Sequence, residues 1–443
     1  MRRTCAYVAV TKDEAQRRIW TFYDVVFIEM PFSPALATSR LSCQRGQLLT
    51  DYPQLILKTG RERSLLNGHP WLFSGAVAKT TSHPDAGDIV LACAAAGEPL
   101  ALGFYHPRAD IAFRMLTREV HIRVDGDFWR RRFRESAALR ERILPVGDNA
   151  WRLINAEGDG IPGLVVDCYG DYLVMGVGTV GVERRREEIV AALAAVSNPR
   201  GILERSEGPA RRLEGLEERR ETVWGEEPPA AIAIRENGLV FEVDVHDGQK
   251  TGFFLDQRDN RRQVEELSRG LTVLNCFSYT GAFSVSAVRG GARRVVSVDS
   301  SEAANEAARR HLMVNGFDAA AHPVIRSDVF RYLRNTEELF DFIILDPPAF
   351  AKNRREVARA ARGYKDINLQ SFRRLAPGGL LATFSCSNAV DEALFEKIVL
   401  GAARDAGRDL RLLRRFTAAP DHPTCLAHGE GRYLKGLLVS VLA

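Results

Sequence analysis

Residues 271–284 read LTVLNCFSYTGAFS, an apolar strand followed by a turn with one glycine and the start of a helix. From here to the end of the chain, short apolar stretches alternate with helical segments. We predict strands at residues 271–276, 294–298, 324–326, 340–345, 379–385, 410–416 and 434–442, with helices between the first six. Such alternation is typical of a parallel, doubly wound α/β sheet, which binds ligands at the carboxyl ends of its strands. The last two strands have no helix between them and should form an antiparallel hairpin at one edge.

The turn after the first strand favours one kind of cofactor. It contains a single glycine, Gly281, whereas a dinucleotide-binding fold brings its backbone close to a pyrophosphate at several glycines. A seven-stranded sheet whose last strand is inserted antiparallel is the arrangement of class I methyltransferases, whose cofactor S-adenosylmethionine (SAM) carries no phosphate. Asn275 would end the strand, Gly281 would open the helix, and the rings of Phe277 and Tyr279 could border an apolar nucleoside. A nicotinamide cofactor is the alternative, but this turn lacks the glycines for it.

Three acidic residues follow the ends of successive strands in the predicted sheet. Asp299 ends the second strand, where an acid accepts hydrogen bonds from both ribose hydroxyls. Asp328 follows the third strand and could accept from the adenine amino group, and Asp346 follows the fourth. A single acid would carry little weight, because Asp often caps the helix that follows it. Three acids in this order predict a SAM site.

The segment before the first strand, residues 246–261, reads HDGQKTGFFLDQRDNR. Its glycines permit tight turns, and Asp256 can cap the Arg-rich helix that follows. The simple interpretation is a hairpin that leads into this helix. The functional interpretation is a flap over the methionine end of the cofactor, in which Lys250 or Arg258 reaches the carboxylate. The residues alone leave both interpretations open.

A carboxylate and a thiol follow two neighbouring strands. The fourth strand leads into Asp346-Pro347-Pro348-Ala349-Phe350, and the fifth ends at Cys386. In amino-methyltransferases an Asp/Asn-Pro-Pro-Tyr/Phe turn holds a planar amino group, but here an alanine precedes the phenylalanine. A thiol beside a carboxylate instead suits covalent chemistry on a flat, electron-poor ring.

Methylation of carbon 5 of a pyrimidine would use such a thiol, because this carbon is a poor nucleophile. When the Cys386 thiolate adds to carbon 6, carbon 5 becomes an enamine carbon that can attack the sulfonium methyl group. Asp346 could donate a proton or a hydrogen bond at N3 of the ring. The sequence does not identify the base that removes the carbon-5 proton. Taken alone, Cys386 would be interpreted as a buried core thiol, and Cys276, on the cofactor strand, is best explained by packing.

The rest of the chain precedes this sheet. Residue Met30 is an alternative start within an N-terminal extension. Short strands separated by Gly and Asp turns then suit a small β-barrel, with Trp71 and Phe73 expected in its core. An Arg-rich helix is predicted at 127–146, and residues 207–229, rich in charge, Gly and Pro, predict a loop. We therefore expect four regions, namely 1–52 (an uncertain extension), 53–124 (the barrel), 125–245 (a central α+β domain) and 246–443 (the doubly wound sheet).

Composition limits the class of protein. With 45% hydrophobic and 27% charged residues, the 443-residue chain is typical of a globular protein with more than one domain. No apolar run is long enough to span a bilayer, and residues 1–50 show no targeting pattern. Seven scattered cysteines argue against a disulfide framework or a metal site and for a reducing cytoplasm. The net charge is only +4, but Arg far outnumbers Lys among the 61 basic residues. This excess of Arg either suits contacts to phosphates and bases or reflects a GC-rich genome.

From about residue 54 to its end, the chain resembles the bacterial RlmI-type 23S ribosomal RNA cytosine-C5 methyltransferases. The matching stretches are 275–284, 298–300, 346–348, 362–368, 383–387 and 431–436. The resemblance implies an N-terminal PUA barrel that binds RNA, a central α+β domain, a C-terminal SAM domain and Cys386 as the nucleophile. Many RNA cytosine-C5 methyltransferases carry a second cysteine where this chain has Pro347-Pro348, and a related guanine-N7 branch has Asn in place of Cys386.

The resemblance makes 23S rRNA, or an assembly intermediate of the large subunit, the expected partner. Carbons 5 and 6 are accessible only in an unstacked cytosine, so the substrate should be a loop or partly unfolded RNA, with Arg-bearing surfaces on its phosphates. Expected substrate contacts are Pro347, Pro348 and Phe350, and also Arg362, Tyr364 and Lys365 in the loop after the fourth strand, unless that stretch is a helix start. No membrane partner is expected, and a homodimer is one option for the assembly state.

Two other functions remain open from the sequence. The protein could methylate an exocyclic amino group or a ring nitrogen through Asp346-Pro347-Pro348, with Cys386 only structural. It could also be a non-catalytic RNA-binding protein of ribosome assembly with a vestigial methyltransferase fold, although the intact acids argue against this.

Overall fold

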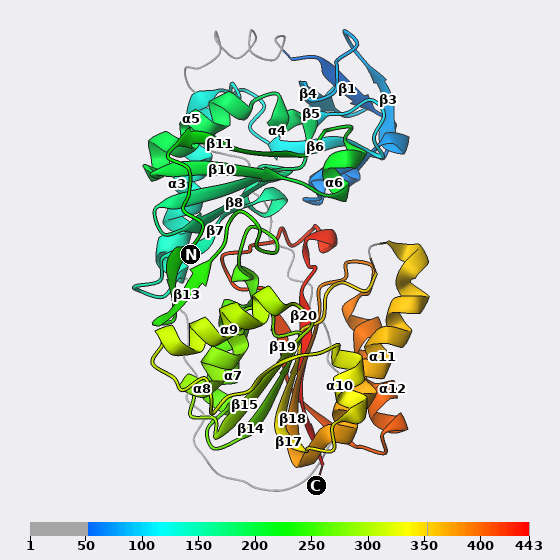
Figure 1. The fold of residues 1–443 in the computed structure, drawn as a ribbon. Helices are drawn as coiled ribbons and strands as arrows, with labels where there is room; N and C mark the ends of the chain where they lie inside the picture. The colour runs from blue at the N-terminus through cyan, green and yellow to red at the C-terminus, as the bar shows by residue number, and fades with distance from the viewer. Residues whose placement is uncertain (1–51, 352, 443) are drawn as a thin grey trace, which may run out of the picture. The chain divides into compact units, whose positions relative to one another are not determined.

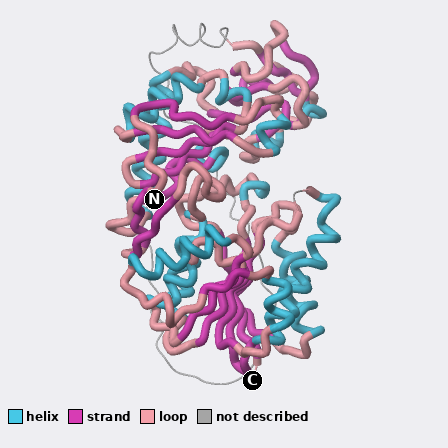
Figure 2. The backbone as a smooth tube through the Cα atoms, viewed as in Figure 1, coloured by secondary structure: helices cyan, strands magenta, loops and turns pink. Residues whose placement is uncertain are grey.

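The computed structural model describes residues 52–351 and 353–442, and the predicted extension with Met30 lies outside them (Figure 1). The largest sheet has seven strands in the order β16-β15-β14-β17-β18-β20-β19. These strands are β14 (Thr272–Cys276), β15 (Arg294–Asp299), β16 (Val324–Arg326), β17 (Phe340–Leu345), β18 (Leu375–Ser385), β19 (Leu410–Thr417) and β20 (Lys435–Val441). The first five pair in parallel, and β20 is antiparallel to both of its neighbours. Figure 2 shows the strands of this sheet side by side in magenta, with helices around them in cyan. This order confirms the predicted α/β fold class.

Helices cover both faces of this sheet (Figure 1). One face carries α7 (Arg258–Leu267), α8 (Ala282–Arg289) and α9 (Glu302–Val314), and the other carries α10 (Val329–Asn335), α11 (Val357–Arg374) and α12 (Glu392–Asp405). Every residue of β14 is buried, as expected for a central strand of a covered parallel sheet. Val273 packs in the core on the side of α7 and α8, whereas Leu274 and Cys276 pack in the core on the side of α11 and α12. The Cys276 thiol is therefore a core group.

The N-terminal region is built on a six-stranded sheet in the order β2-β6-β5-β4-β1-β3. Its strands are β1 (Gln54–Leu57), β2 (Trp71–Phe73), β3 (Val77–Thr80), β4 (Ile89–Cys93), β5 (Pro99–Tyr105) and β6 (Ile111–Thr117). Side chains alternate between the faces of β2, so Leu72 is buried in the core while Phe73 is 49% exposed and Trp71 is half-buried. The prediction of both rings in the barrel core is therefore wrong. Trp71 Nε1 instead donates to Glu157 Oε1 at 2.8 Å.

A five-stranded sheet in the order β11-β10-β9-β8-β7 comes next. Its strands are β7 (Ala150–Asn155), β8 (Leu164–Tyr169), β9 (Tyr172–Val177), β10 (Gly201–Ser206) and β11 (Arg219–Gly225), with α3 (Gly126–Ile143) and α5 (Arg186–Ser197) beside them (Figure 1). The predicted loop at 207–229 is wrong, because this stretch contains α6 (Pro209–Leu213) and the edge strand β11. Most side chains of β11 are polar and none is buried. Its pairing with β10 runs through backbone groups, which composition does not reveal.

A hairpin connects the five-stranded and seven-stranded sheets. It consists of β12 (Ile232–Glu236) and β13 (Leu239–Val243). Phe241 of this hairpin packs in one core with Tyr169 and Val174 of the five-stranded sheet and with Val285 and Leu312 of α8 and α9. The segment after β13 is therefore held beside the seven-stranded sheet before it enters a short 3-10 turn, η3 (Leu255–Gln257), and α7.

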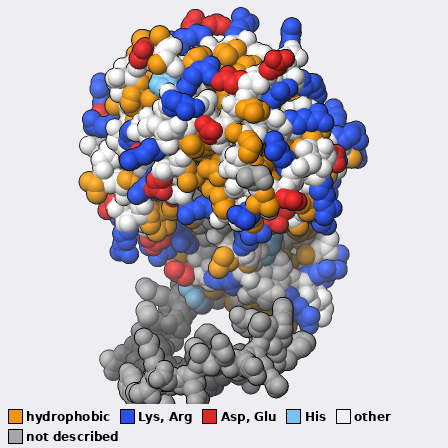
Figure 3. Space-filling model, turned by 90° about the horizontal axis from the view of Figure 1, so that it is seen from below, with side chains coloured by type: hydrophobic (Ala, Val, Ile, Leu, Met, Phe, Trp, Pro, Cys, Tyr) orange, Lys and Arg blue, Asp and Glu red, His pale blue; other side chains and the backbone are white. Residues whose placement is uncertain are grey.

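The surface carries mixed charge. On the face seen from below in Figure 3, Lys and Arg side chains are spread among acidic and hydrophobic ones. Within the described ranges, no helix combines the length and the apolar character needed to cross a membrane.

Candidate active site

A cavity of about 200 Å³ opens at the carboxyl ends of β14, β15, β17 and β18. It is lined by the turns that follow these strands and by the segment before α7. Among the predicted site residues it brings together Lys250, Asp256, Phe277, Tyr279, Asp299, Asp346, Pro347, Pro348 and Cys386. Because these residues come from separate segments, the parallel sheet is what places them around one space.

The turn after β14 has an unusual backbone. Phe277 has a φ of 58° and Tyr279 a φ of 47°, in the left-handed region that residues other than glycine rarely adopt. Such strain persists where the surroundings fix it, and here Asp299 Oδ2 accepts a hydrogen bond from Tyr279 N at 2.9 Å. Gly281 has a φ of 77°, and a Cβ at this position would lie 2.8 Å from the Cβ of Ala308 in α9. The close approach of α9 therefore explains why the turn keeps this one glycine.

Several polar atoms in the cavity have no partner. Among the described residues, the hydroxyls of Ser278 and Thr280 and one carboxylate oxygen of Asp256 are buried without a hydrogen bond. Buried polar groups are nearly always paired, so these atoms indicate a polar ligand. The rings of Phe277 and Phe283 lie in the same wall, and the combination fits a nucleoside joined to an amino acid, as in SAM. Sequence reasoning missed Ser278 and Thr280, although both stand in the turn that it singled out.

Asp256 anchors the segment before α7. It is 2% exposed, and its Oδ2 accepts from Lys250 Nζ at 2.6 Å and from the Tyr433 hydroxyl at 2.6 Å. Burial favours a higher pKa for Asp256, but the charges of Lys250 and His422 outweigh it and hold the pKa below the usual range. An ionised Asp256 thus fixes one N–H of Lys250 and leaves the others for a ligand. Tyr433 was not predicted, and it lies 177 residues from Asp256 in the chain.

Asp346 follows β17 and is half-buried in the cavity wall. Its Oδ2 accepts from Gln257 Nε2 at 3.0 Å, and Gln257 Oε1 accepts from Asn260 Nδ2 at 2.6 Å. Burial, and then the negative charge of Asp256, raise the pKa of Asp346 to about 7, against the opposing effects of Lys250 and Gln257. Near neutral pH this carboxyl group can therefore both hold and release a proton. Gln257 and Asn260 were not predicted, although both lie in the segment 246–261.

Cys386 follows β18 and lines the same cavity. Its side chain is half-buried, and Sγ lies 3.9 Å from the carbonyl oxygen of Pro347, in the turn after β17. Burial, with a contribution from the negative charge of Asp346, raises the pKa of the Cys386 thiol to about 11. The thiol is therefore protonated at rest, and any reaction that needs its thiolate requires a change in its surroundings.

Three predicted substrate residues lie in a helix instead of a loop. Arg362, Tyr364 and Lys365 all belong to α11. Tyr364 is fully buried, and its hydroxyl forms hydrogen bonds with Ser385 Oγ at 3.0 Å and Ser387 Oγ at 2.9 Å. Tyr364 therefore contacts the residues on either side of Cys386 and does not line the cavity.

The other residues from this stretch differ in exposure. Lys365 Nζ lies 2.7 Å from Asp405 Oδ2, whereas Arg362 is exposed and has no ion pair with any described residue. Phe350 packs on the ring of Tyr364, with centroids 4.6 Å apart, and lies outside the cavity lining.

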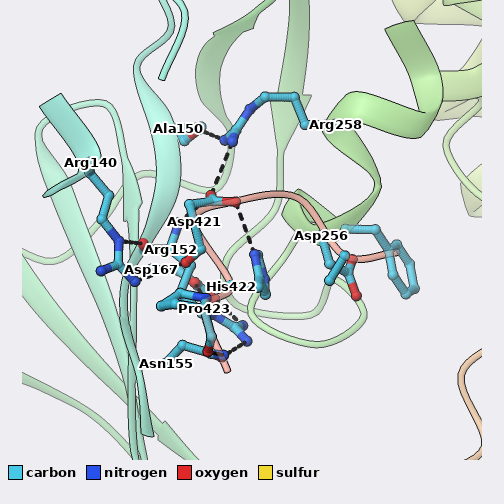
Figure 4. A network of polar contacts seen from close by, with 12 residues as sticks. Arg140, Ala150, Arg152, Asn155, Asp167, Asp256, Arg258, Asp421, His422 and Pro423 are labelled. Carbon is cyan, nitrogen blue, oxygen red and sulfur yellow. Dashed lines mark hydrogen bonds and ion pairs between the residues drawn. The ribbon is translucent and has the colours of Figure 1, made fainter. Parts of the chain in front are cut away.

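Four of the predicted cofactor residues lie outside the cavity lining as well, namely Gly281, which is described above, and three others. Asn275 is buried and donates to Ser284 Oγ at 2.9 Å. Asp328 is exposed and caps α10 by accepting from Arg331 N at 2.9 Å. Arg258 is 1% exposed, is not part of the cavity lining and points toward Ala150 and Asp421 (Figure 4). Of the two candidates for the cofactor carboxylate, the structure therefore brings only Lys250 to the cavity.

Arg258 belongs to a buried polar cluster between the five-stranded sheet and the loop that follows β19 (Figure 4). Its Nη1 lies 3.1 Å from Asp421 Oδ2, and its Nη2 donates to Ala150 O at 2.6 Å. Asp421 Oδ2 also accepts from Arg152 N at 2.9 Å, and Arg140 Nη2 donates to Asp421 O at 2.9 Å. The loop is thereby tied to β7 and α3.

Comparison with family models matches residues 217–438 to the S-adenosylmethionine-dependent methyltransferases and residues 55–118 to the PUA-like domain. Among curated proteins, the chain is 44% identical over 389 residues to Ribosomal RNA large subunit methyltransferase I of Aeromonas salmonicida (strain A449), covering 87% of this chain and 98% of that protein. It is 41% identical over 395 residues to the protein of the same name from Klebsiella pneumoniae subsp. pneumoniae, covering 88% and 99%.

Two solved structures extend the comparison. A chain from Streptococcus mutans, assigned as a SAM-dependent methyltransferase, has a TM-score of 0.75 at 26% identity and covers 88% of this chain and 100% of its own. Another methyltransferase candidate, crystallised as a complex with SAH, has a TM-score of 0.76 at 27% identity with the same coverage.

Proposed function

Because this chain belongs to the family of ribosomal RNA large subunit methyltransferase I, a SAM-dependent methyltransferase with a PUA-like domain, we propose that it methylates carbon 5 of a cytosine in 23S ribosomal RNA. The observation that carries this proposal is the pair Cys386 and Asp346, which line one cavity from neighbouring strands. A nucleophilic thiol has a use in methylation of a ring carbon and none in methylation of an amino group.

In the proposed reaction, Cys386 loses its proton and its thiolate sulfur adds to carbon 6 of the cytosine. The electron pair of the carbon 5–carbon 6 double bond moves so that carbon 5 becomes nucleophilic. Carbon 5 would then take the methyl group from the sulfonium of SAM, whose methyl–sulfur bond breaks and leaves its electron pair on sulfur. A base then removes the proton from carbon 5, the double bond re-forms, and the carbon–sulfur bond breaks to release the Cys386 thiolate. Each step conserves atoms and electrons, and one cysteine suffices. A release mechanism with two cysteines would need a cysteine in the turn after β17, where this chain has Pro347 and Pro348.

Asp346 would assist this addition at N3 of the ring. Negative charge builds up on the ring when the thiolate adds, and a proton or a hydrogen bond at N3 offsets it. A carboxyl group with a pKa of about 7 suits this role, because its neutral form is populated near neutral pH. Gln257 holds one oxygen of Asp346, which leaves the other for the base.

SAM supplies the methyl group as a sulfonium. We propose that Asp299 binds its ribose hydroxyls and that Lys250 binds its carboxylate, with the rings of Phe277 and Tyr279 beside the nucleoside. The unpartnered hydroxyls of Ser278 and Thr280 support this assignment.

The RNA would contact more than the cavity. We propose a division into a PUA-like RNA-binding domain at 53–124, a central domain at 125–245 and the SAM domain at 246–443. Single-stranded or flipped cytosine would enter the cavity, while exposed arginines such as Arg362 bind phosphates. The separate six-, five- and seven-stranded sheets support this division.

The decisive experiment is incubation of the protein with labelled SAM and 23S rRNA, followed by digestion to nucleosides. Label in 5-methylcytidine is the expected result, and replacement of Cys386 by Ala should abolish it. Label in N4-methylcytidine, guanosine or adenosine would exclude the proposed carbon-5 chemistry. A Cys386→Ala variant with full turnover would exclude the covalent step.

A further inference from the structure

Lys435, the first residue of β20, holds the loop that carries Cys386. Lys435 pairs with Ser385 across the β18–β20 ladder. Its Nζ donates to Ser387 O at 2.7 Å and to Val390 O at 2.7 Å, in the loop that follows β18. The ammonium group therefore fixes the backbone on the carboxyl side of the thiol.

This cation is buried without a carboxylate in ion-pair contact, although Asp391 and Glu392 at the start of α12 act on it at longer range. Lys435 is 7% exposed, and among residues 52–351 and 353–442 no acidic group lies within ion-pair distance of its Nζ. The other lysines near the site differ, since Lys250 pairs with Asp256 at 2.6 Å and Lys365 with Asp405 at 2.7 Å. A buried charge without a counter-charge is costly. A negative charge that forms nearby during a reaction would compensate it.

The same loop has a second, uncharged support. The hydroxyl of Tyr364 forms hydrogen bonds with Ser385 Oγ and Ser387 Oγ, at 3.0 Å and 2.9 Å. Ser387 Oγ also accepts from Ala351 N at 3.2 Å. Neutral hydrogen bonds from α11 and from the turn after β17 already fix the loop, so the position of Cys386 alone does not require a charged residue at 435.

We propose that Lys435 is a positioning residue for Cys386, which holds the loop and places a positive charge where the thiolate forms. The inference rests on the proposed role of Cys386 as the nucleophile. The thiolate otherwise faces mainly unfavourable neighbours. Asp256 is negative, and Asp346 is negative above about pH 7. Lys250 lowers the pKa of the thiol, but it is already paired with Asp256. Burial lowers the pKa of Lys435, and the charges that oppose this effect are those of Cys386, Asp391 and Glu392. When the Cys386 proton leaves to solvent, the ammonium group of Lys435 therefore gains a further negative neighbour.

Alkylation of Cys386 by iodoacetamide tests this without RNA or SAM. In this reaction the thiolate sulfur bonds to carbon and iodide leaves, so the rate reports the thiolate fraction. The rate is measured between pH 7 and 11 by mass spectrometry of the peptide that contains Cys386. With Lys435→Gln, which keeps N–H donors but loses the charge, or with the apolar Lys435→Met, we expect alkylation at pH 8 to be about tenfold slower, as for a midpoint shift of about one unit.

Two matched variants separate charge from support. Lys435→Arg keeps the charge and should restore the rate to within about threefold of the wild type. Tyr364→Phe removes the neutral support and should leave the alkylation rate at pH 8 unchanged. Thermal unfolding identifies folded variants, and either uncharged variant that folds is sufficient. A wild-type rate at pH 8 in a folded uncharged variant, or an equally slow rate in Tyr364→Phe, would overturn the inference.

A failure of the proposed function can be distinguished from a failure of the inference about Lys435. If the wild type forms no 5-methylcytidine, the function is wrong even where the uncharged variants react more slowly, and the difference in rate then describes only the thiol. If 5-methylcytidine forms but the alkylation rate at pH 8 does not change, Lys435 has no electrostatic role.

Discussion

Replacement of Asp346 by Asn should make the protein more stable at pH 8 while it slows methyl transfer. Burial, and then the negative charge of Asp256, raise the pKa of Asp346 to about 7 from a value of 3.8. Asn has nearly the same shape and can still accept the hydrogen bond from Gln257, but it carries no charge. It can donate a hydrogen bond to N3 of the cytosine but cannot transfer a proton to it.

The size of the effect follows from linkage between proton binding and folding. Between about pH 4 and pH 7, folded Asp346 keeps its proton while the unfolded chain has lost it, so the stability of the wild type falls as the pH rises through this window. One unit of pKa is worth about 1.36 kcal/mol, and the difference between 3.8 and about 7 therefore amounts to at most about 4 kcal/mol. The stability advantage of Asp346→Asn should be near zero at pH 4 and reach at most about 4 kcal/mol at pH 8.

Urea unfolding at pH 4, 6 and 8 measures this difference, because all other titrating groups are shared by the two proteins. Asp405→Asn is the matched control, since Asp405 is 50% exposed and pairs with Lys365 at the surface. Its effect should stay below about 1 kcal/mol at each pH. An advantage of Asp346→Asn that is independent of pH, or a loss of stability at pH 8, would refute the electrostatic argument.

Three further predictions concern cofactor, RNA and stability. Asp299→Ala should weaken SAM binding by about tenfold or more in calorimetry, because two ribose hydrogen bonds are lost; unchanged affinity would remove Asp299 from the site. Arg362→Ala should raise KM for the rRNA severalfold and reduce the salt dependence of binding by about one phosphate contact. Lys365→Met should change neither quantity, and equal effects of the two substitutions would argue against a specific contact of Arg362. Asp421→Ala should lower the free energy of unfolding by about 3–5 kcal/mol, because Arg258 loses a partner in a buried cluster; chemical denaturation would show it, and a loss below about 1 kcal/mol would contradict the assignment.

The strand ends were predictable from sequence for a physical reason. Parallel strands buried on both faces need continuous apolar runs, so their ends can be located in the sequence, and their carboxyl ends meet at one edge. This placed Asp299, Asp346 and Cys386 around one cavity. The edge strand β11 escaped prediction because an exposed edge can be formed from charged residues.

The supporting contacts were not predictable because they join residues distant in the chain. Tyr433 reaches Asp256 across 177 positions, and Lys435 reaches Ser387 across 48. Local pattern also cannot tell which way a side chain turns in a loop. Lys250 and Arg258 were equivalent candidates in sequence, yet the first lines the cavity and the second is enclosed among buried acids.

The polar cluster around Asp421 has a consequence for modularity. Its members come from α3, β7, α7 and the loop between β19 and β20, so it crosses the boundary at which the SAM domain would be excised. A fragment that starts at residue 246 would keep Arg258 and Asp421 but lose Asp148, Ala150 and Arg152 as partners. The methyltransferase sheet is therefore not an interchangeable part, and hybrid enzymes between relatives should exchange the central region and the last loop together.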